Sequence, residues 1–138
     1  MKVNWQGVYP AVTTQFHQDE SINLDATQQV IDGLIRDGVD GIISLGTVGE
    51  NCSLTAQEKR QVIQAAKEVV QGRVPLLSGC AETTTLAAGE YVKDVTEIGV
   101  DGVMLLPGMV YRSTLPEAIA HYQKVARDNP NKPLMIYN

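Results

Sequence analysis

The 138-residue sequence predicts an α/β fold in which helices cover a parallel β-sheet. Two observations predict it. Five apolar runs alternate with four helical patterns, and the runs are nearly continuous in Val, Ile, Leu and Met, as expected for strands buried on both faces. The length suits a single domain, residues 1–138. The expected strands cover residues 7–14, 39–45, 74–78, 100–106 and 133–137.

The four expected helices begin and end at recognisable signals. An asparagine and two Thr-x-x-Glu capping boxes satisfy amide groups at helix starts, and glycines end helices. The third helix is expected over residues 84–98, and prolines flank the fourth. The starting signals are Asn23, Thr55 with Glu58, and Thr114 with Glu117, and the glycines that end helices are Gly38, Gly72 and Gly99.

The tetrapeptide Gly-Val-Asp-Gly occurs twice, at 38–41 and 99–102, each time at the start of an expected strand. The two copies are two βα units apart, at about thirty residues per unit. The repeat indicates that one helix-to-strand turn is used twice, and it does not indicate repeated chemistry. Asp40 and Asp101 are therefore expected at the amino ends of strands, where side chains serve stability.

The composition argues against several classes of partner. The net charge is −5 and no Lys/Arg cluster stands out, so nucleic acid and anionic membranes are not expected to bind. No apolar stretch approaches the roughly 20 residues that span a bilayer. Two cysteines are too few for a disulfide framework, and no His/Cys cluster suggests a metal. We expect a cytoplasmic protein without metal or cofactor.

The segment Gly46-Thr47-Val48-Gly49-Glu50 is the strongest candidate for a functional site. It follows the second expected strand, and the carboxyl ends of parallel strands are where α/β folds place their chemistry. The glycines let a substrate approach the backbone, and Thr47 can hydrogen-bond a carboxylate or relay a proton. Alternatively, Thr47 only caps a turn. Glu50 is expected to anchor backbone amides rather than act as a base.

Four stretches, read together, resemble the N-terminal part of the dihydrodipicolinate synthase/N-acetylneuraminate lyase family of Schiff-base aldolases. The resemblance spans essentially the whole chain. It implies a (β/α)8 TIM barrel, of which this chain supplies about the first four and a half βα units. The stretches are Gly7–Thr14, Gly46–Glu50, Leu106–Tyr111 and Ile136–Asn138.

The resemblance also implies an activity and roles for particular residues. In that family a 2-oxo acid such as pyruvate condenses with a lysine on the sixth strand. By resemblance, Tyr137 is the proton shuttle, Thr47 is its hydroxyl partner, and the loop from Gly46 to Gly49 holds the substrate carboxylate. Tyr111 matches a tyrosine that crosses a subunit interface, which implies a homo-oligomer. Alternatively, Tyr137 and Tyr111 serve packing.

Two departures from the family pattern bear on activity. Val48 stands where better-known members have a second threonine, so one hydroxyl donor to the carboxylate is lost. This favours a 2-oxo acid other than the substrate of dihydrodipicolinate synthase itself. The Schiff-base lysine is expected beyond Asn138, because none of the lysines falls at the carboxyl end of a strand. We expect them on solvated helix faces, helix ends or the amino side of strands: Lys2, Lys59, Lys67, Lys93, Lys124 and Lys132.

The remaining histidines and cysteines are expected to be structural. His17 falls in a polar surface turn, and His121 lies on the helix after the fourth strand, away from the active face. Cys52 and Cys80 lie near strand ends but lack a neighbouring base. We expect both to be small buried packing residues.

Four and a half βα units cannot close an eight-stranded barrel. The first and fifth strands would be open edges, so we expect the chain to be a segment of a longer polypeptide, to pair with a second copy or missing segment, or to aggregate. An alternative function is an inactive half-barrel that binds a ligand or partner without turnover. A phosphate-binding barrel is disfavoured, because its usual phosphate site follows strands seven and eight.

Overall fold

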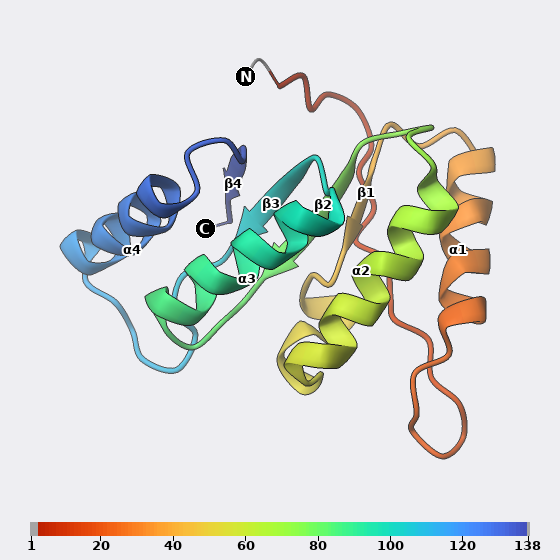
Figure 1. Ribbon diagram of the computed structural model, residues 1–138, viewed down its shortest axis with the longest axis horizontal. Helices are drawn as coiled ribbons and strands as arrows, with labels where there is room; N and C mark the ends of the chain where they lie inside the picture. The colour runs from red at the N-terminus through yellow and green to blue at the C-terminus, as the bar shows by residue number, and fades with distance from the viewer. Residues whose placement is uncertain (1–2, 138) are drawn as a thin grey trace.

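Four parallel strands form a sheet in chain order, each hydrogen-bonded to the strand that follows it (Figure 1). The computed structural model describes residues 3–137. All three strand pairings are parallel, and a helix connects each strand to the next. The predicted succession of βα units is therefore confirmed. The strands are β1 (Ile42–Ser44), β2 (Leu76–Cys80), β3 (Gly102–Leu105) and β4 (Leu134–Ile136).

The four helices begin at the predicted caps. The Asn23 side chain accepts a hydrogen bond from the Ala26 amide at 2.9 Å, and both capping boxes are formed. Left-handed residues follow α2 and α3, as expected where glycines end helices. The helices are α1 (Leu24–Arg36), α2 (Ala56–Val70), α3 (Thr85–Ile98) and α4 (Leu115–Asp128). None of the helices that the structure describes is long and apolar enough to cross a bilayer.

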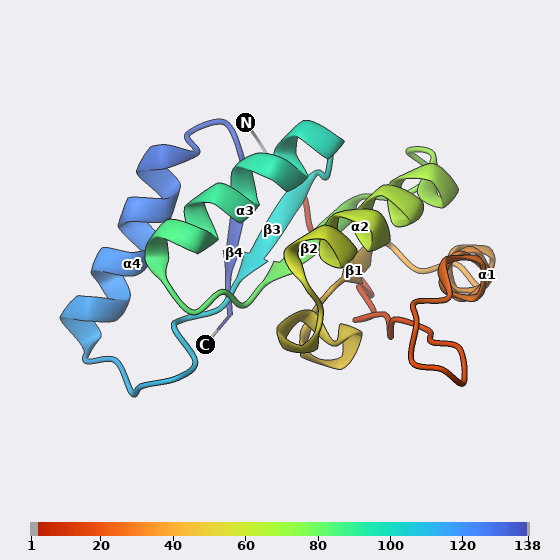
Figure 2. The same cartoon turned by 60° about the horizontal axis from the view of Figure 1, so that its bottom comes forward.

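The sheet separates two apolar clusters, and the helices cover only one face, as Figure 2 shows for α2 and α3. The larger cluster lies between sheet and helices, where strand residues such as Leu76 meet helix residues such as Val62. The smaller cluster, on the other face, holds alternate strand residues and contains no helix residue from the described part of the chain. Its members are Ile43, Leu77, Ala81, Met104 and Leu106, with Trp5, Tyr9 and Met135 packed against them. We call this second side the inner face.

The first expected strand is reduced to a single bridge. Ala11 pairs with Ile43 in parallel, the Val12 amide donates to the Ile43 carbonyl at 2.9 Å, and the Ile43 amide donates to the Pro10 carbonyl at 3.0 Å. Proline has no N–H to extend such a ladder, so the segment lies beside β1 as an extended edge. β1 is also shorter than expected, and it ends at Ser44 because Leu45 adopts a left-handed φ of 55° and leaves the extended conformation.

The repeated Gly-Val-Asp-Gly motif forms the same contact twice. The Asp40 amide and carboxylate bind the backbone carbonyl and amide of Val8, at 2.9 and 2.7 Å. Asp101 binds the backbone of Leu76 in the same way, at 2.8 and 2.9 Å. Each aspartate thus fixes its own strand to the neighbouring segment. The interpretation of the repeat as a shared turn is confirmed.

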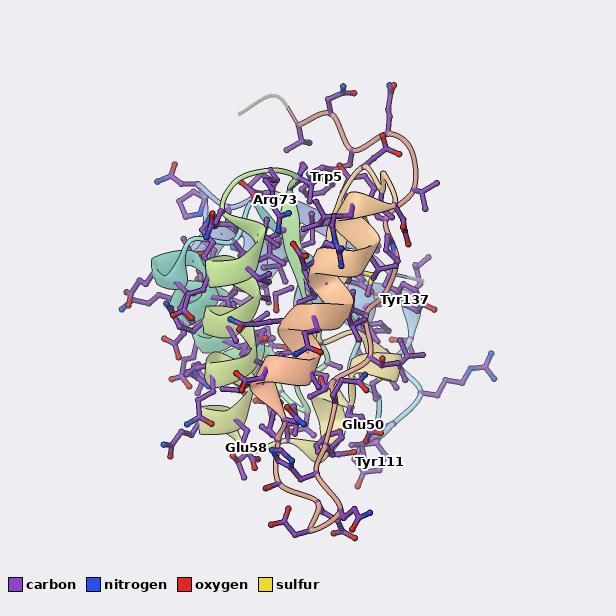
Figure 3. The ribbon with its side chains drawn as sticks, turned by 90° about the vertical axis from the view of Figure 1, so that its right-hand side faces the viewer. Trp5, Glu50, Glu58, Arg73, Tyr111 and Tyr137 are labelled. Carbon is purple, nitrogen blue, oxygen red and sulfur yellow. The ribbon has the colours of Figure 1, made fainter. Side chains whose placement is uncertain are left out.

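The second glycine of each motif makes room for an aromatic ring. A Cβ on Gly41 would lie 1.9 Å from the Tyr9 ring, and one on Gly102 would lie 2.3 Å from the Trp5 ring. Both rings pack on the inner face near the amino ends of the strands. Figure 3 shows Trp5 at the opposite end of the molecule from Glu50. The amino end is therefore filled by the chain's own aromatic residues.

We expect Gly79→Ala to destabilise the fold. A Cβ on Gly79 would lie 2.0 Å from the Leu45 carbonyl oxygen, a backbone atom that cannot move without shifting the end of β1. The expected loss is about 1–3 kcal/mol of unfolding free energy, measured by urea denaturation followed by circular dichroism. Gly33→Ala is the matched control: it lies inside α1 with no atom near its Cβ position. It should gain about 0.5–1 kcal/mol. Equal midpoints for Gly79→Ala and the parent chain would contradict the prediction.

Candidate functional site

The carboxyl ends of the four strands share one edge of the sheet, because every pairing is parallel. We call this edge the rim. Thr47 follows β1, Tyr111 lies in the loop between β3 and α4, and Tyr137 directly follows β4. In Figure 3, Glu50 and Tyr111 both lie toward the lower, rim end of the molecule, and Tyr137 lies at an intermediate height. All the predicted site residues therefore belong to the rim or to a strand end that reaches it.

The loop from Gly46 to Glu50 is a tight turn, here called the threonine loop. A short 3₁₀ helix, η1 (Thr47–Gly49), is closed by hydrogen bonds from the Gly49 amide to the Gly46 carbonyl at 3.0 Å and from the Glu50 amide to the Thr47 carbonyl at 3.1 Å. Left-handed Leu45 and Glu50 flank it. Such backbone in non-glycine residues is strained and persists only where surrounding contacts enforce it.

Two residues of the N-terminal segment, Val12 and Thr14, pack against the backbone of the threonine loop. Buried Gly49 accepts a 2.7 Å hydrogen bond from the Thr14 hydroxyl through its carbonyl, and a Cβ on Gly49 would lie 2.9 Å from the Val12 carbonyl oxygen. These contacts leave the Thr47 and Val48 side chains exposed, with Val48 at 55%. The loop therefore presents a hydroxyl and an isopropyl group to solvent over a fixed backbone.

Met104 lies between the threonine loop and the last strand on the inner face. A Cβ on Gly46 would lie 3.6 Å from the Met104 methyl carbon, and Met104 pairs with Met135 across the β3–β4 ladder. Tyr137 follows Met135 by two residues, and its amide continues the ladder by donating to the Leu105 carbonyl at 3.0 Å. By the alternation of strand side chains, Tyr137 belongs to the same face as Met135. Its ring is about half exposed.

Tyr111 lies apart from the threonine loop. It is 84% exposed, and it lines a shallow cavity of about 270 Å³ between the starts of α3 and α4. The cavity wall includes Thr83, Thr85 and His121 but not Thr47. Within one chain, Tyr111 therefore points to solvent over the α3–α4 side of the rim.

Glu50 does not anchor a helix start. Its carboxylate accepts no hydrogen bond from residues 3–137, and instead it lines a surface hollow with His17. The carboxylate that binds amides at the start of α2 is Glu58, which accepts from the Thr55 amide at 2.8 Å. The hydrogen bonds from Thr55 lower the pKa of Glu58. The expectation for Glu50 was wrong because the left-handed turn at this residue precedes the helix by several positions.

Lys59 is not on a solvated helix face, contrary to expectation. It is only 6% exposed, and its ammonium lies 2.6 Å from the carboxylate of Glu82, just after β2. The ammonium also lies 5.9 Å from the centre of the Tyr91 ring, which belongs to the helix-covered cluster. Lys59 is therefore neutralised by an ion pair on the face of the sheet opposite to Met104.

Of the other titratable candidates, His121 and Cys80 are buried packing residues. The His121 ring is buried and bridges the Thr85 hydroxyl at 3.0 Å and the Leu106 carbonyl at 3.2 Å, as expected for a packing residue. Cys80 is buried, and burial raises the pKa of its thiol to about 12. Cys52 is exposed, so its expected burial was wrong. Within residues 3–137, no three His, Cys, Asp or Glu side chains gather closely enough to hold a metal ion.

Three polar residues near the rim were not predicted from the sequence. Asn51 is fully buried, and Ser78 and Tyr91 share a buried hydrogen bond of 2.7 Å. The available signal was polarity in apolar surroundings: Ser78 interrupts an otherwise apolar strand, and Tyr91 lies on the buried side of α3. A buried polar side chain needs a partner, and the partners come from distant segments that a sequence alone does not place together.

Comparisons with known proteins agree on one family. The model of the Dihydrodipicolinate synthetase family matches residues 4–138. A 4-hydroxy-tetrahydrodipicolinate synthase of Methanococcus maripaludis is 37% identical over 133 residues, which is 96% of this chain and 45% of that protein. The chain therefore spans about half the length of the curated relatives that it matches.

Solved structures show the same likeness. A prophage protein of E. coli, solved in complex with pyruvate and belonging to the dihydrodipicolinic acid synthase family, superposes with a TM-score of 0.92 at 30% identity, over 99% of this chain and 45% of that one. The dihydrodipicolinate synthase of Acinetobacter baumannii, also complexed with pyruvate, gives 0.94 at 27% identity, over 98% of this chain and 46% of that one. The structural neighbours are TIM barrels, and the chain corresponds to their N-terminal part.

Proposed function

Because the chain belongs to the Dihydrodipicolinate synthetase family, we propose that the protein carrying it is a lyase or synthase that acts on pyruvate or a similar 2-oxo acid through a lysine Schiff base. One observation carries the proposal: the threonine loop and the Met135–Tyr137 strand end flank Met104 on the inner face. Two relatives of known structure bind pyruvate. The curated relatives named as synthases are about twice as long as this chain.

In the proposed reaction, a lysine amine adds to the carbonyl carbon of the 2-oxo acid and water leaves, which forms an iminium ion. Loss of a proton from the adjacent carbon gives an enamine, which is the carbon nucleophile. Each step moves a proton, and Tyr137 is proposed to carry it, with the Thr47 hydroxyl as relay. The loop from Gly46 to Gly49 is proposed to hold the substrate carboxylate through the amides that the turn leaves free, since the Gly49 amide already donates to the Gly46 carbonyl.

Val48 bears on which 2-oxo acid is used. Its exposed isopropyl group stands beside the proposed carboxylate contacts and offers no hydrogen bond. A substrate bound there has one donor fewer than a second hydroxyl would supply. We therefore infer a family branch whose preferred 2-oxo acid differs from that of the 4-hydroxy-tetrahydrodipicolinate synthases, and pyruvate is the probe because two relatives are solved with it.

The nucleophilic lysine is proposed to come from beyond residue 138. Lys59 is ion-paired on the helix-covered face, and Lys132 donates to the Val100 carbonyl, at the amino end of β3. Burial lowers the pKa of Lys132, but at the end of the sheet remote from the rim. Among residues 3–137, the cluster on the inner face consists of apolar and aromatic side chains.

The same observation favours a second candidate function. A half-barrel that binds a 2-oxo acid without turnover needs the loop and the inner face but no amine. Covalent trapping separates the two candidates, because only the enzyme forms an imine with its substrate.

We expect pyruvate with sodium borohydride to modify a protein that continues past residue 138 and to leave the 138-residue chain unmodified. Borohydride reduces the imine to a stable amine, so intact mass spectrometry reports one pyruvate-derived adduct per chain. Borohydride alone is the control. An adduct on the 138-residue chain would overturn the assignment of its lysines as bystanders. Binding of pyruvate by the longer protein without any adduct would support the inactive half-barrel.

We expect Tyr137→Phe in the longer protein to lower kcat by about 10²–10⁴-fold, because it removes the proposed proton carrier and keeps the ring. Thr47→Val should lower kcat and raise KM, and Thr47→Ser should retain most of the activity because it keeps the hydroxyl. Tyr9→Phe is the matched control, since Tyr9 packs near the amino ends of the strands. Steady-state kinetics with pyruvate give kcat and KM for each variant and for the parent enzyme. A Tyr137→Phe enzyme as fast as Tyr9→Phe would contradict the proton-shuttle role.

We propose that the protein is a homo-oligomer that self-associates through the apolar surface around Tyr111. The beginnings of α3 and α4 and the loop before α4 expose five large apolar side chains: Leu86, Met109, Val110, Tyr111 and Leu115. An apolar surface of this kind gains free energy when a second molecule covers it. An interface there is proposed to bring Tyr111 to the site of the partner.

Light scattering after size-exclusion chromatography should show a mass above that of the 15.0 kDa monomer, and Leu115→Glu should lower it. Val8→Glu is the control, because Val8 is exposed near the amino ends of the strands. A monomeric parent chain would count against self-association, and equal dissociation by both variants would count against this surface.

A further inference from the structure

The Gly79 carbonyl, near the carboxyl end of β2, accepts two buried side-chain hydrogen bonds. The Ser78 hydroxyl donates to it at 3.0 Å and the Asn51 amide nitrogen at 3.3 Å. The Ser78 and Asn51 side chains are fully buried. The strand end is closely packed, because a Cβ on Gly79 would collide with the Leu45 carbonyl. One carbonyl therefore joins β2 to the segment that follows the threonine loop.

The hydrogen-bond direction on the helix side follows from counting protons. Each hydroxyl has one proton, and that of Ser78 points to the Gly79 carbonyl, so the Tyr91 hydroxyl donates to Ser78. Burial raises the pKa of Tyr91 and keeps its phenol protonated. Lys59 and Arg60 each lie 5.9 Å from the ring centre. Residues of α2, α3 and β2 thus fix this donor in place.

Asn51 makes the connection on the loop side. It begins a second 3₁₀ helix, η2 (Asn51–Ser53), and its own amide lies 3.5 Å from the Gly46 carbonyl, across the threonine loop. The Asn51 side-chain oxygen has no hydrogen-bond partner among the described residues, and leaving a buried acceptor unpaired costs roughly 1–3 kcal/mol. A residue selected for stability alone would be apolar here. The placement is explained if the side-chain amide of Asn51 is needed to orient the threonine loop.

We propose that Asn51 is a positioning residue for the threonine loop. It acts through the Gly79 carbonyl, to which the Ser78 hydroxyl of the Tyr91–Ser78 pair also donates. This inference rests on the proposed function of that loop. By fixing Gly46 to the end of β2, Asn51 sets where the loop amides and the Thr47 hydroxyl lie. A displacement of about 1 Å in such groups can lower a reaction rate 10²-fold.

The first test is amide hydrogen exchange of the 138-residue chain, read for the peptide covering residues 46–54. Asn51→Ala should speed exchange in this peptide by about 10-fold or more relative to the rest of the chain. Val125→Ala is the matched control, since it removes buried volume in α4, away from the loop. It should lower the melting temperature without a selective effect on residues 46–54. The same exchange pattern in both variants would overturn the proposal.

The second test is kinetic and uses the longer protein. Asn51→Ala should raise KM for pyruvate about 10-fold, and Val125→Ala should leave KM unchanged at a comparable loss of melting temperature. Tyr91→Phe, which removes only the donor to Ser78, should raise KM in the same direction and decides the question if Asn51→Ala does not fold. The double variant with Asn51→Ala and Tyr91→Phe should raise KM by less than the product of the two single increases, because both side chains act through the Gly79 carbonyl.

The outcomes separate this inference from the proposed function. If the parent protein neither binds nor converts pyruvate, the proposed function fails, and hydrogen exchange alone decides whether Asn51 fixes the loop. If the parent protein converts pyruvate but Asn51→Ala and Tyr91→Phe leave KM unchanged, the positioning role fails and the proposed function stands.

Discussion

Parallel pairing from β1 to β4 is the constraint on which the site depends. Since all strands run the same way, their carboxyl ends meet at one edge, and loops far apart in the sequence become neighbours there. The pairing requires close packing at that edge: Gly79 admits no Cβ beside the Leu45 carbonyl, and the chain turns through left-handed residues directly after β1. The geometry of the threonine loop is thus a consequence of how closely β1 and β2 pack.

The two ends of the sheet differ in how their polar groups are satisfied. At the amino end, Asp40 and Asp101 satisfy backbone groups of neighbouring segments, and Trp5 and Tyr9 fill the space above Gly102 and Gly41. The carboxylates of Asp40 and Asp101 thus both have backbone partners within the chain. At the rim, by contrast, Thr47 and Tyr111 face solvent, and the buried Asn51 side-chain oxygen has no hydrogen-bond partner within residues 3–137. Groups left available in this way are what a binding site requires.

Much of the fold could be predicted from local signals, because helix caps and βα periodicity depend on residues that are close together in the sequence. The Thr55–Glu58 box and the double Gly-Val-Asp-Gly turn are examples. Long-range partners could not be predicted. Lys59 was expected to be solvated because its ion-pair partner, Glu82, is distant in the sequence. The first strand was expected to be complete because its apolar run does not show how Pro10 limits pairing. The roles of Thr47, Tyr111 and Tyr137 came from family resemblance and stay predictions.

The location of Lys59 explains why an amine on this chain is poorly suited to be the nucleophile. A lysine becomes nucleophilic when desolvation lowers its pKa without an opposing carboxylate. Lys59 is desolvated, but Glu82 lies 2.6 Å away, and the side chain is on the helix-covered face. The inner face offers the complementary surroundings: Ile43, Leu77 and Met104 make an apolar wall. An amine brought to that wall by a later strand would lose solvent without gaining a carboxylate partner there, so the inner face supplies the surroundings that would activate the proposed lysine.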